Sequence, residues 1–444
     1  MQTRLGELLF SSGETTESFI ERYKATGKAL FKETNNRDFQ TLDLSVMTVS
    51  RWRNGGVKGL PRFPAPAVLE RMFPRLTAKD LFAPAGGSSM PPAVGSVIDE
   101  SDLVMNARRA AEHASDAAAS NLPDMTLDQV EDDALALARA YHTHPPFAVY
   151  GMGNELLATV TAMLDRTQIV RQRERLYLAA GQASAVLATA VFDLGSITAA
   201  TSFARTAAMY GEVVDHGPLR AFAHGTLGIL AYWDQRPAEA IRQVEKAQSF
   251  PGLGDTARQR LAVIEARAYG HLGDANSARL AATAALEPGD GKRDGLHDDV
   301  GGEFSFSRRR ALMSNATTFL LVKDGPAAEQ SAMESIALMR KVHDSGLSTP
   351  QEATDLAQAA IDLSHARLLA GEFDGAVEAV APVFEIPKEW RVAGITSRAG
   401  GLRRALASPE ISGPGPVRVE LAERIEEYVA VGAHSQLGGT LAIG

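Results

Sequence analysis

From Arg171 onward the chain repeats one pattern: a long helix-forming segment, a tight turn, and a second helix-forming segment rich in Ala. Five such turns, at Gly195, Gln235, Gly273, Gly325 and Gly371, are roughly 40, 38, 52 and 46 residues apart. Small residues beside each turn let paired helices approach closely, and each pair leaves an apolar face that only the next pair can cover. The pattern predicts an all-α protein whose main part is an α-solenoid.

The other segments are also predicted to be helical. An Ala-rich helix is expected over 101–120, and a second over Thr126–Thr143, capped by Thr126 and stopped at Pro145–Pro146. Terminal helices are expected over 387–407 and 417–431. The Gly- and Asp-rich segment 290–302 has no helical period and is expected to be an exposed loop.

Residues 45–55 have the pattern of a short helix that reads DNA. Ser45 is a good N-cap, Val49 and Trp52 lie three apart on one face, and Gly55 is placed to end the helix. We expect Val49 and Trp52 to be core residues. The opposite face carries small polar and guanidinium groups, which reach base edges and phosphates in a major groove. The alternative is an ordinary amphipathic surface helix.

Each remaining residue of this segment has an expected role. Recognition helices read bases with residues at and after their N-terminus, so the candidates for base contact are Val46, Met47, Ser50 and Arg51. The candidates for phosphate contact are Thr48, Arg53, Asn54 and Lys58. For each residue the alternative is a solvated surface group.

Charge is distributed unevenly along the chain. Residues 1–82 carry 13 Lys/Arg and 9 Asp/Glu, a net of +4, whereas the whole chain has a net charge of −9. A basic module is the electrostatic footprint expected for phosphate contact, and DNA would repel the acidic remainder. We therefore expect a helix-turn-helix DNA-binding domain over 1–82, a Gly/Ser/Pro-rich linker over 83–100, a helical repeat domain over 101–410, and a C-terminal helix and tail over 411–444.

Two groups of residues resemble a known type of regulator. The first group resembles the helix-turn-helix module of the xenobiotic-response-element (Cro/phage-repressor type) regulators of actinobacteria, and comprises Thr48–Trp52, Gly59–Arg62, Val68–Phe73 and Asp80–Phe82. The second resembles the tetratricopeptide-type sensor region fused to such modules, and comprises Tyr141–Pro146, Phe304–Phe306 and Leu369–Ala376. One departure is that segment 25–44, between the second and third helices, is longer than in a minimal helix-turn-helix.

The resemblance implies a cytoplasmic transcription regulator that binds a double-stranded DNA operator as a homodimer. It also implies that the repeat domain senses a peptide or small-molecule effector, mediates dimerisation, or both. Tyr269, Arg308 and Asn315 are the candidate effector-binding residues, and the alternative for each is a hydrogen bond between repeats or a surface group. The competing hypothesis for the whole chain is a tetratricopeptide-type interaction scaffold that binds no operator.

No catalytic motif is found, so we do not expect an enzyme or a cofactor. The chain has no cysteine, which excludes disulfides and thiolate metal sites. His142 with His144, and His297 with Asp298 and Asp299, are too few for a convincing metal site, and a helix end and a solvated loop are the preferred interpretations. We expect neither a signal peptide nor a membrane span.

Overall fold

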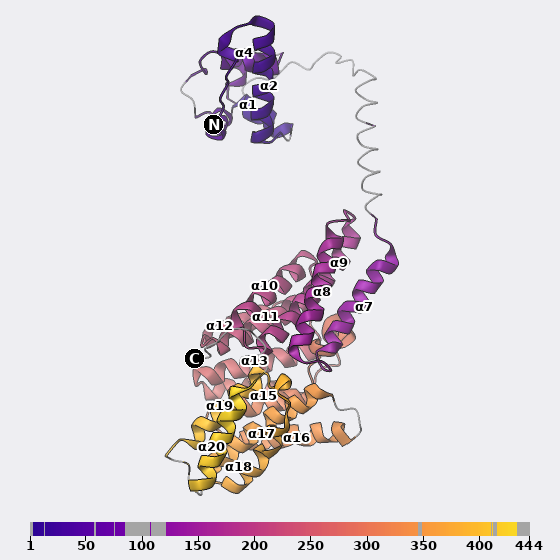
Figure 1. The fold of residues 1–444 in the computed structure, drawn as a ribbon, viewed down its shortest axis with the longest axis vertical. Helices are drawn as coiled ribbons and strands as arrows, with labels where there is room; N and C mark the ends of the chain where they lie inside the picture. Colours follow the sequence, from indigo (N-terminus) through magenta and orange to yellow (C-terminus); the bar gives the residue numbers. More distant parts are fainter. Residues whose placement is uncertain are drawn as a thin grey trace. The chain divides into compact units, whose positions relative to one another are not determined.

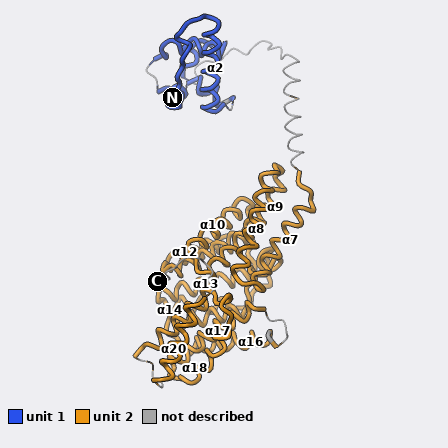
Figure 2. The backbone as a smooth tube through the Cα atoms, in the orientation of Figure 1, with its two compact units in different colours: residues 1–106 blue, residues 107–444 orange. Residues whose placement is uncertain are grey.

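The computed structural model describes residues 3–12, 14–56, 59–74, 76–84, 107, 121–344, 349–409, 411 and 415–432. Within these residues the fold is all-α, as predicted, and contains no strand. The chain divides into unit 1, residues 1–106, and unit 2, residues 107–444 (Figures 1 and 2). The helix expected over 101–120 and the linker from residue 85 onward lie outside the described residues.

Unit 1 is a small helical bundle. Its helices are α1 (Arg4–Ser11), α2 (Thr16–Thr34), α3 (Val46–Arg53), α4 (Ala65–Met72) and α5 (Ala78–Leu81), with a 3-10 turn, η1 (Arg37–Phe39). Thr15 caps α2 by accepting from the Ser18 amide, and Thr77 and Asp80 form a capping box on α5. The start of the expected linker belongs to this unit, because the Arg4 amide donates to the Ala83 carbonyl at 2.9 Å.

The long connection between α2 and α3 is packed against the bundle. Phe39 of η1 and Leu44 are both 5% exposed and belong to the core of unit 1. Gly27 of α2 allows this packing, because a Cβ there would lie 2.0 Å from Leu42 Cδ1. The extra length noted in the sequence therefore adds apolar contacts to the bundle without separating α3 from it.

Unit 2 consists of antiparallel helix pairs joined by short turns. Its helices are α7 (Asp124–Ala140), α8 (Pro146–Leu164), α9 (Val170–Asp193), α10 (Ile197–Val213), α11 (Gly217–Trp233), α12 (Pro237–Gln248), α13 (Asp255–Leu272), α14 (Ala275–Ala284), α15 (Arg308–Leu321), α16 (Gly325–Asp344), α17 (Pro350–Ala370), α18 (Phe373–Val380), α19 (Ala393–Leu406) and α20 (Gly415–Ala430). All five predicted turns separate consecutive helices, and Gly195, Gly273 and Gly371 adopt positive φ there.

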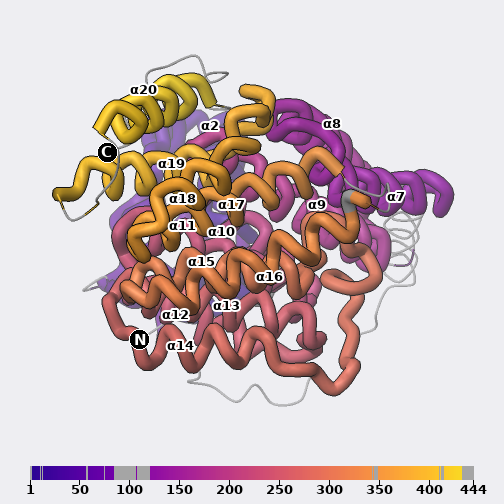
Figure 3. Tube along the Cα trace, turned by 90° about the horizontal axis from the view of Figure 1, so that it is seen from below, coloured from indigo at the N-terminus to yellow at the C-terminus, as the bar shows by residue number. Residues whose placement is uncertain are grey.

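The helices of unit 2 form an inner and an outer layer. The inner helices α9, α11, α13, α15, α17 and α19 each contact the next member of the series, while α10, α12, α14, α16 and α18 pack outside them. Figure 3 shows α15, α16 and α17 running side by side. This stepwise packing is consistent with an α-solenoid. In addition α19 contacts α9, so the first and last inner helices meet and enclose space between them.

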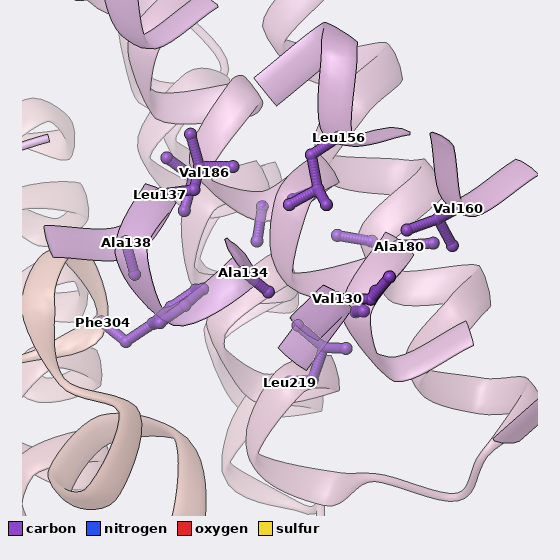
Figure 4. Close-up of a cluster of buried hydrophobic side chains, with 14 of the residues drawn as sticks. Val130, Ala134, Leu137, Ala138, Leu156, Val160, Ala180, Val186, Leu219 and Phe304 are labelled. Atoms are coloured by element: carbon purple, nitrogen blue, oxygen red, sulfur yellow. The ribbon is translucent and has the colours of Figure 1, made fainter. Parts of the chain in front are cut away.

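The core of unit 2 starts where α7, α8 and α9 meet. Val130 and Ala134 of α7 pack with Val160 of α8 and Val186 of α9 (Figure 4). Phe304, from the 3-10 turn η3 (Gly302–Phe304), is fully buried in the same cluster. A segment between α14 and α15 thus packs against the start of the unit.

Two sequence expectations need correction. Segment 290–302 is not wholly exposed, because Asp294 and His297 fold inward with a π-helical turn, η2 (Gly295–Val300), and Leu296 is fully buried. Thr126 does not cap α7, which begins two residues earlier, after Pro123. The C-terminal helix α20 packs on the repeats, since its Leu421, Ile425 and Tyr428 lie in one core with α17–α19.

One described helix, α9, is long and apolar enough to span a membrane, and 72% of its apolar window is buried inside the unit. This burial is typical of the central helix of a soluble protein. The composition of α9 is therefore explained by its position in the inner layer.

Candidate functional site

The outward face of α3 is the first candidate site. Val46, Met47, Ser50, Arg51 and Asn54 are all exposed, and Val46 and Met47 are 54% and 64% exposed. Their spacing of one, four, five and eight residues places them on one side of a helix. Such large exposed apolar side chains beside a guanidinium are available for contact with an external partner.

The inward face of α3 fixes the helix to unit 1. Val49 is fully buried and Trp52 is 5% exposed, as predicted. The Trp52 ring makes edge contacts with Tyr23 and Phe82, at centroid distances of 6.0 and 5.7 Å. Ser45 accepts from the Thr48 amide at 3.2 Å and caps the helix, as predicted. The outward residues are therefore held on a rigid element.

The predicted phosphate-contact residues differ in their surroundings. Thr48 and Arg53 are only half-exposed, and Arg53 Nη1 donates to Thr16 Oγ1 at 3.3 Å. Asn54 is exposed and follows the last residue of α3. Lys58 lies outside the described residues. The structure thus groups Asn54 with the base-contact candidates and turns Arg53 partly toward α2.

Arg51 differs from two other arginines of unit 1, which form ion pairs with carboxylates. Arg22 pairs with Glu14 at 2.6 Å, and Arg71 pairs with Glu33 at 3.0 Å. No described residue forms an ion pair with Arg51. Its positive charge therefore remains available to an anionic partner such as a phosphate or a base edge.

The three predicted effector-binding residues lie apart from the cavities of unit 2. Asn315 is 1% exposed and donates from Nδ2 to the Ala282 carbonyl, which is a hydrogen bond between helix pairs. Arg308 is a surface residue that pairs with Glu334 at 3.1 Å. Tyr269 is half-exposed on α13. None of them lines either cavity described below, and their binding of an effector stays a prediction.

The second candidate site is a partly open polar cavity lined by the inner helices. It has a volume of about 160 Å³, and all six inner helices contribute to its lining. Charged side chains from five of these helices meet here, among them Asp193, Arg260, Arg310, Asp355 and Arg398. Ligand sites typically combine an apolar wall with a few convergent polar groups, and this cavity has both.

The charged residues of the cavity form a buried network. Arg310 Nε lies 3.3 Å from Asp355 Oδ2, and Arg310 Nη1 lies 3.8 Å from Glu303 Oε2, an ion pair too long for a hydrogen bond. Burial alone would lower the pKa of Arg310, but Asp355 and Glu303 hold it above its ordinary value. Arg310 is therefore the shared counter-ion of two buried carboxylates.

Asp193 and Tyr141 form the other polar pair of this cavity. The Tyr141 hydroxyl donates to Asp193 Oδ2, and both side chains are buried. Burial raises the pKa of Asp193 to about 7, although the hydrogen bond from Tyr141 opposes the shift. Because this pKa is above the value of an unfolded aspartate, the contribution of Asp193 to stability is present in acid and is lost as pH rises toward and through 7.

We therefore expect Asp193→Asn to stabilise unit 2 in a pH-dependent way. Asn keeps an oxygen that accepts from the Tyr141 hydroxyl, but it cannot ionise. The gain in free energy of unfolding over wild type is therefore small near pH 4.5 and reaches roughly 2–4 kcal/mol at pH 8. Urea unfolding at both pH values, followed by circular dichroism, measures the difference. A gain that is the same at both pH values would contradict the buried titration of Asp193.

The histidine motifs of the sequence do not form a metal site in the described structure. His144 is exposed, and His142 lies at the end of α7, where its carbonyl accepts from the Gln351 amide. His297 is 2% exposed and its Nδ1 lies 3.0 Å from Asp294 Oδ1. No group of three His, Cys, Asp or Glu side chains suited to a metal occurs among the described residues. The expectation that His297 lies in a solvated loop is wrong.

Sequence reasoning missed the cavity, although a signal was present. Gln351, Asp355, Gln358 and Asp362 recur at helical spacing on α17, and all four are at most 8% exposed. A polar stripe on one face of an otherwise Ala- and Leu-rich helix indicates buried partners. On α13, Arg260 and Arg267 lie two helical turns apart in the same way.

No protein-family model matches the chain, and no curated protein shows significant sequence similarity to it. The functional argument therefore depends on the residues of α3 and of the cavity.

Proposed function

We propose that this protein is a sequence-specific DNA-binding transcription regulator whose unit 2 senses an effector. The observation that carries the proposal is the two-sided construction of α3. Its inward face is anchored by Val49 and Trp52, and its outward face presents Met47, Ser50 and Arg51 from a capped N-terminus. A short rigid helix with this arrangement suits insertion into a major groove.

The polar cavity supports the sensor half of the proposal. Buried ionic groups are costly and are found where a protein needs a specific partner or switch. The cavity draws on all six inner helices, so an occupant contacts each repeat and can stabilise one arrangement of them. Homodimerisation on a two-fold symmetric operator remains a prediction from the resemblance of the sequence.

Mapping of binding sites across genomic DNA fragments with the purified protein tests the proposal. A preferred motif at moderate salt is expected, with affinity that falls steeply as salt rises. If no motif is enriched and a specific protein partner co-purifies instead, the interaction-scaffold hypothesis replaces the proposal.

At an operator found in this way, we expect Arg51→Ala to weaken binding and relax the base preference. A bidentate arginine contact with guanine contributes about 1–3 kcal/mol, which is roughly 5- to 150-fold in affinity. Arg71→Ala is the matched control, because Arg71 is an exposed arginine of unit 1 already paired with Glu33. Titration of a labelled duplex at fixed salt measures both variants. Equal losses of affinity for the two variants would show that α3 does not read the bases.

A further inference from the structure

Two cavities of unit 2 share lining residues, among them Arg267 of α13. The polar cavity adjoins a second cavity of about 370 Å³, and the two share Tyr232, Trp233, Arg267 and Arg398. The second cavity is also lined by the exposed Arg404 of α19. Arg267 therefore lines both the cavity that includes Arg404 and the cavity that holds the buried network.

The two shared arginines differ in their ion pairs and in the number of their hydrogen bonds. Arg398 pairs with Asp362 at 3.1 Å and also donates to Gln358 Oε1 and Thr317 Oγ1. Arg267 is 6% exposed and donates only from Nη2, to the carbonyl and Oγ of Ser314. No described residue accepts from its Nε, and none forms an ion pair with it. Arg267 is therefore a buried cation without a counter-ion.

The carboxylates near Arg267 form no ion pair with it. Of the nearby carboxylates, Asp355 and Glu303 form their ion pairs with Arg310, and Asp362 forms its ion pair with Arg398. Arg260, two turns away on α13, donates to the Phe222 carbonyl and Thr226 Oγ1 and also has no ion pair among the described residues. A buried cation without an ion-pair partner is destabilising, so Arg267 favours a bound anion. Arg260 is partly compensated by the longer-range attraction of Glu303.

The walls beside Arg267 suit a flat apolar group. The Tyr232 ring lies 5.9 Å from the guanidinium carbon of Arg267, and the Trp233 ring makes an edge contact with Phe192 at 5.2 Å. His271 stacks on Tyr232, and burial lowers its pKa to about 4, so this histidine is neutral near pH 7. The positive charge at the junction therefore comes from arginine, next to aromatic surface.

We propose that the paired cavities bind a small organic acid, whose carboxylate contacts Arg267 and whose aromatic or branched apolar body lies against Tyr232 and Trp233. The inference rests on the proposed sensor role of unit 2 and names the class of effector. A carboxylate supplies the missing counter-ion and can accept from the free Nε–H, whereas a neutral ligand would leave Arg267 without an ion pair.

The test uses the full-length protein and two probes of the same shape, naphthalene-1-carboxylate and naphthalene-1-carboxamide, in isothermal titration calorimetry at pH 7.5 and low salt. We expect the carboxylate to bind about tenfold or more tightly than the amide. In Arg267→Met this preference disappears. Arg220→Met is the control, because Arg220 stacks on Phe250 but lines neither cavity, and it should keep the preference.

Circular dichroism establishes that each variant is folded, and Arg267→Gln replaces Arg267→Met if the latter is not. Equal binding of the two probes by wild type, no binding of either at millimolar concentration, or a preference that survives in the Arg267 variant would each overturn the inference. DNA is absent from this experiment, so loss of operator recognition and loss of anion binding are separate results.

Discussion

Replacing Arg310 with Met should destabilise unit 2 by about 3–5 kcal/mol at pH 8, because it leaves buried carboxylates without their counter-ion. Glu303 and Asp355 are 6% and 4% exposed in their side chains, and both depend on Arg310. Met fills most of the volume of the Arg310 side chain. The loss of stability therefore reflects the missing charge and not a new cavity. Urea unfolding followed by circular dichroism gives the free energy of unfolding.

The destabilisation by Arg310→Met should be smaller at pH 5. Burial already raises the pKa of Glu303, and a buried carboxylate is costly only in its charged form. Since that form becomes more populated as pH rises, the loss of stability grows from acid to alkaline pH.

Arg175→Met is the matched control for Arg310→Met. Arg175 pairs with Asp128 and Glu131 at 2.6 Å, but these carboxylates are 63% and 47% exposed. Water screens such pairs, so we expect a loss below about 1 kcal/mol. Comparable losses of stability for the two variants would mean that water reaches the Arg310 network freely.

Trp52→Ala should unfold most of unit 1 and abolish operator binding, although Trp52 contacts no DNA in the proposed complex. Removal of a buried Trp side chain typically costs about 3–5 kcal/mol, and a domain of this size has little more stability than that. Trp52 contacts Tyr23 of α2 and Phe82 beyond α5, so its loss affects three parts of the bundle. Thermal unfolding by circular dichroism and titration with DNA measure the two effects.

Met47→Ala on the same helix provides the contrast. Met47 is 64% exposed, so its truncation should change the stability of unit 1 by less than about 0.5 kcal/mol. Under the proposed function it weakens operator binding through loss of an apolar base contact. If Trp52→Ala leaves both the unfolding transition and DNA binding unchanged, α3 is not anchored as the structure describes.

The helices and turns of this chain were largely predictable because their causes are local. Ser45 caps α3 through an amide three residues away, and Gly371 ends α17 because its positive φ is strained for most other residues. The burial of Val49 and Trp52 followed from a spacing of three residues. Predictions failed where a segment without periodicity gains burial from distant partners, as in η2 and around His297.

The sequence by itself determined the all-α class, the order of helix pairs and the outward set of residues on α3, since each depends on contacts within a turn or two of helix. Only the tertiary structure decided which polar residues share a site. Arg267 of α13 lines the same cavity as Arg398 of α19 because the series of inner helices brings α19 back into contact with α9. The angle between successive helix pairs sets the course of this series, and it depends on the packing of many side chains, which no local pattern encodes.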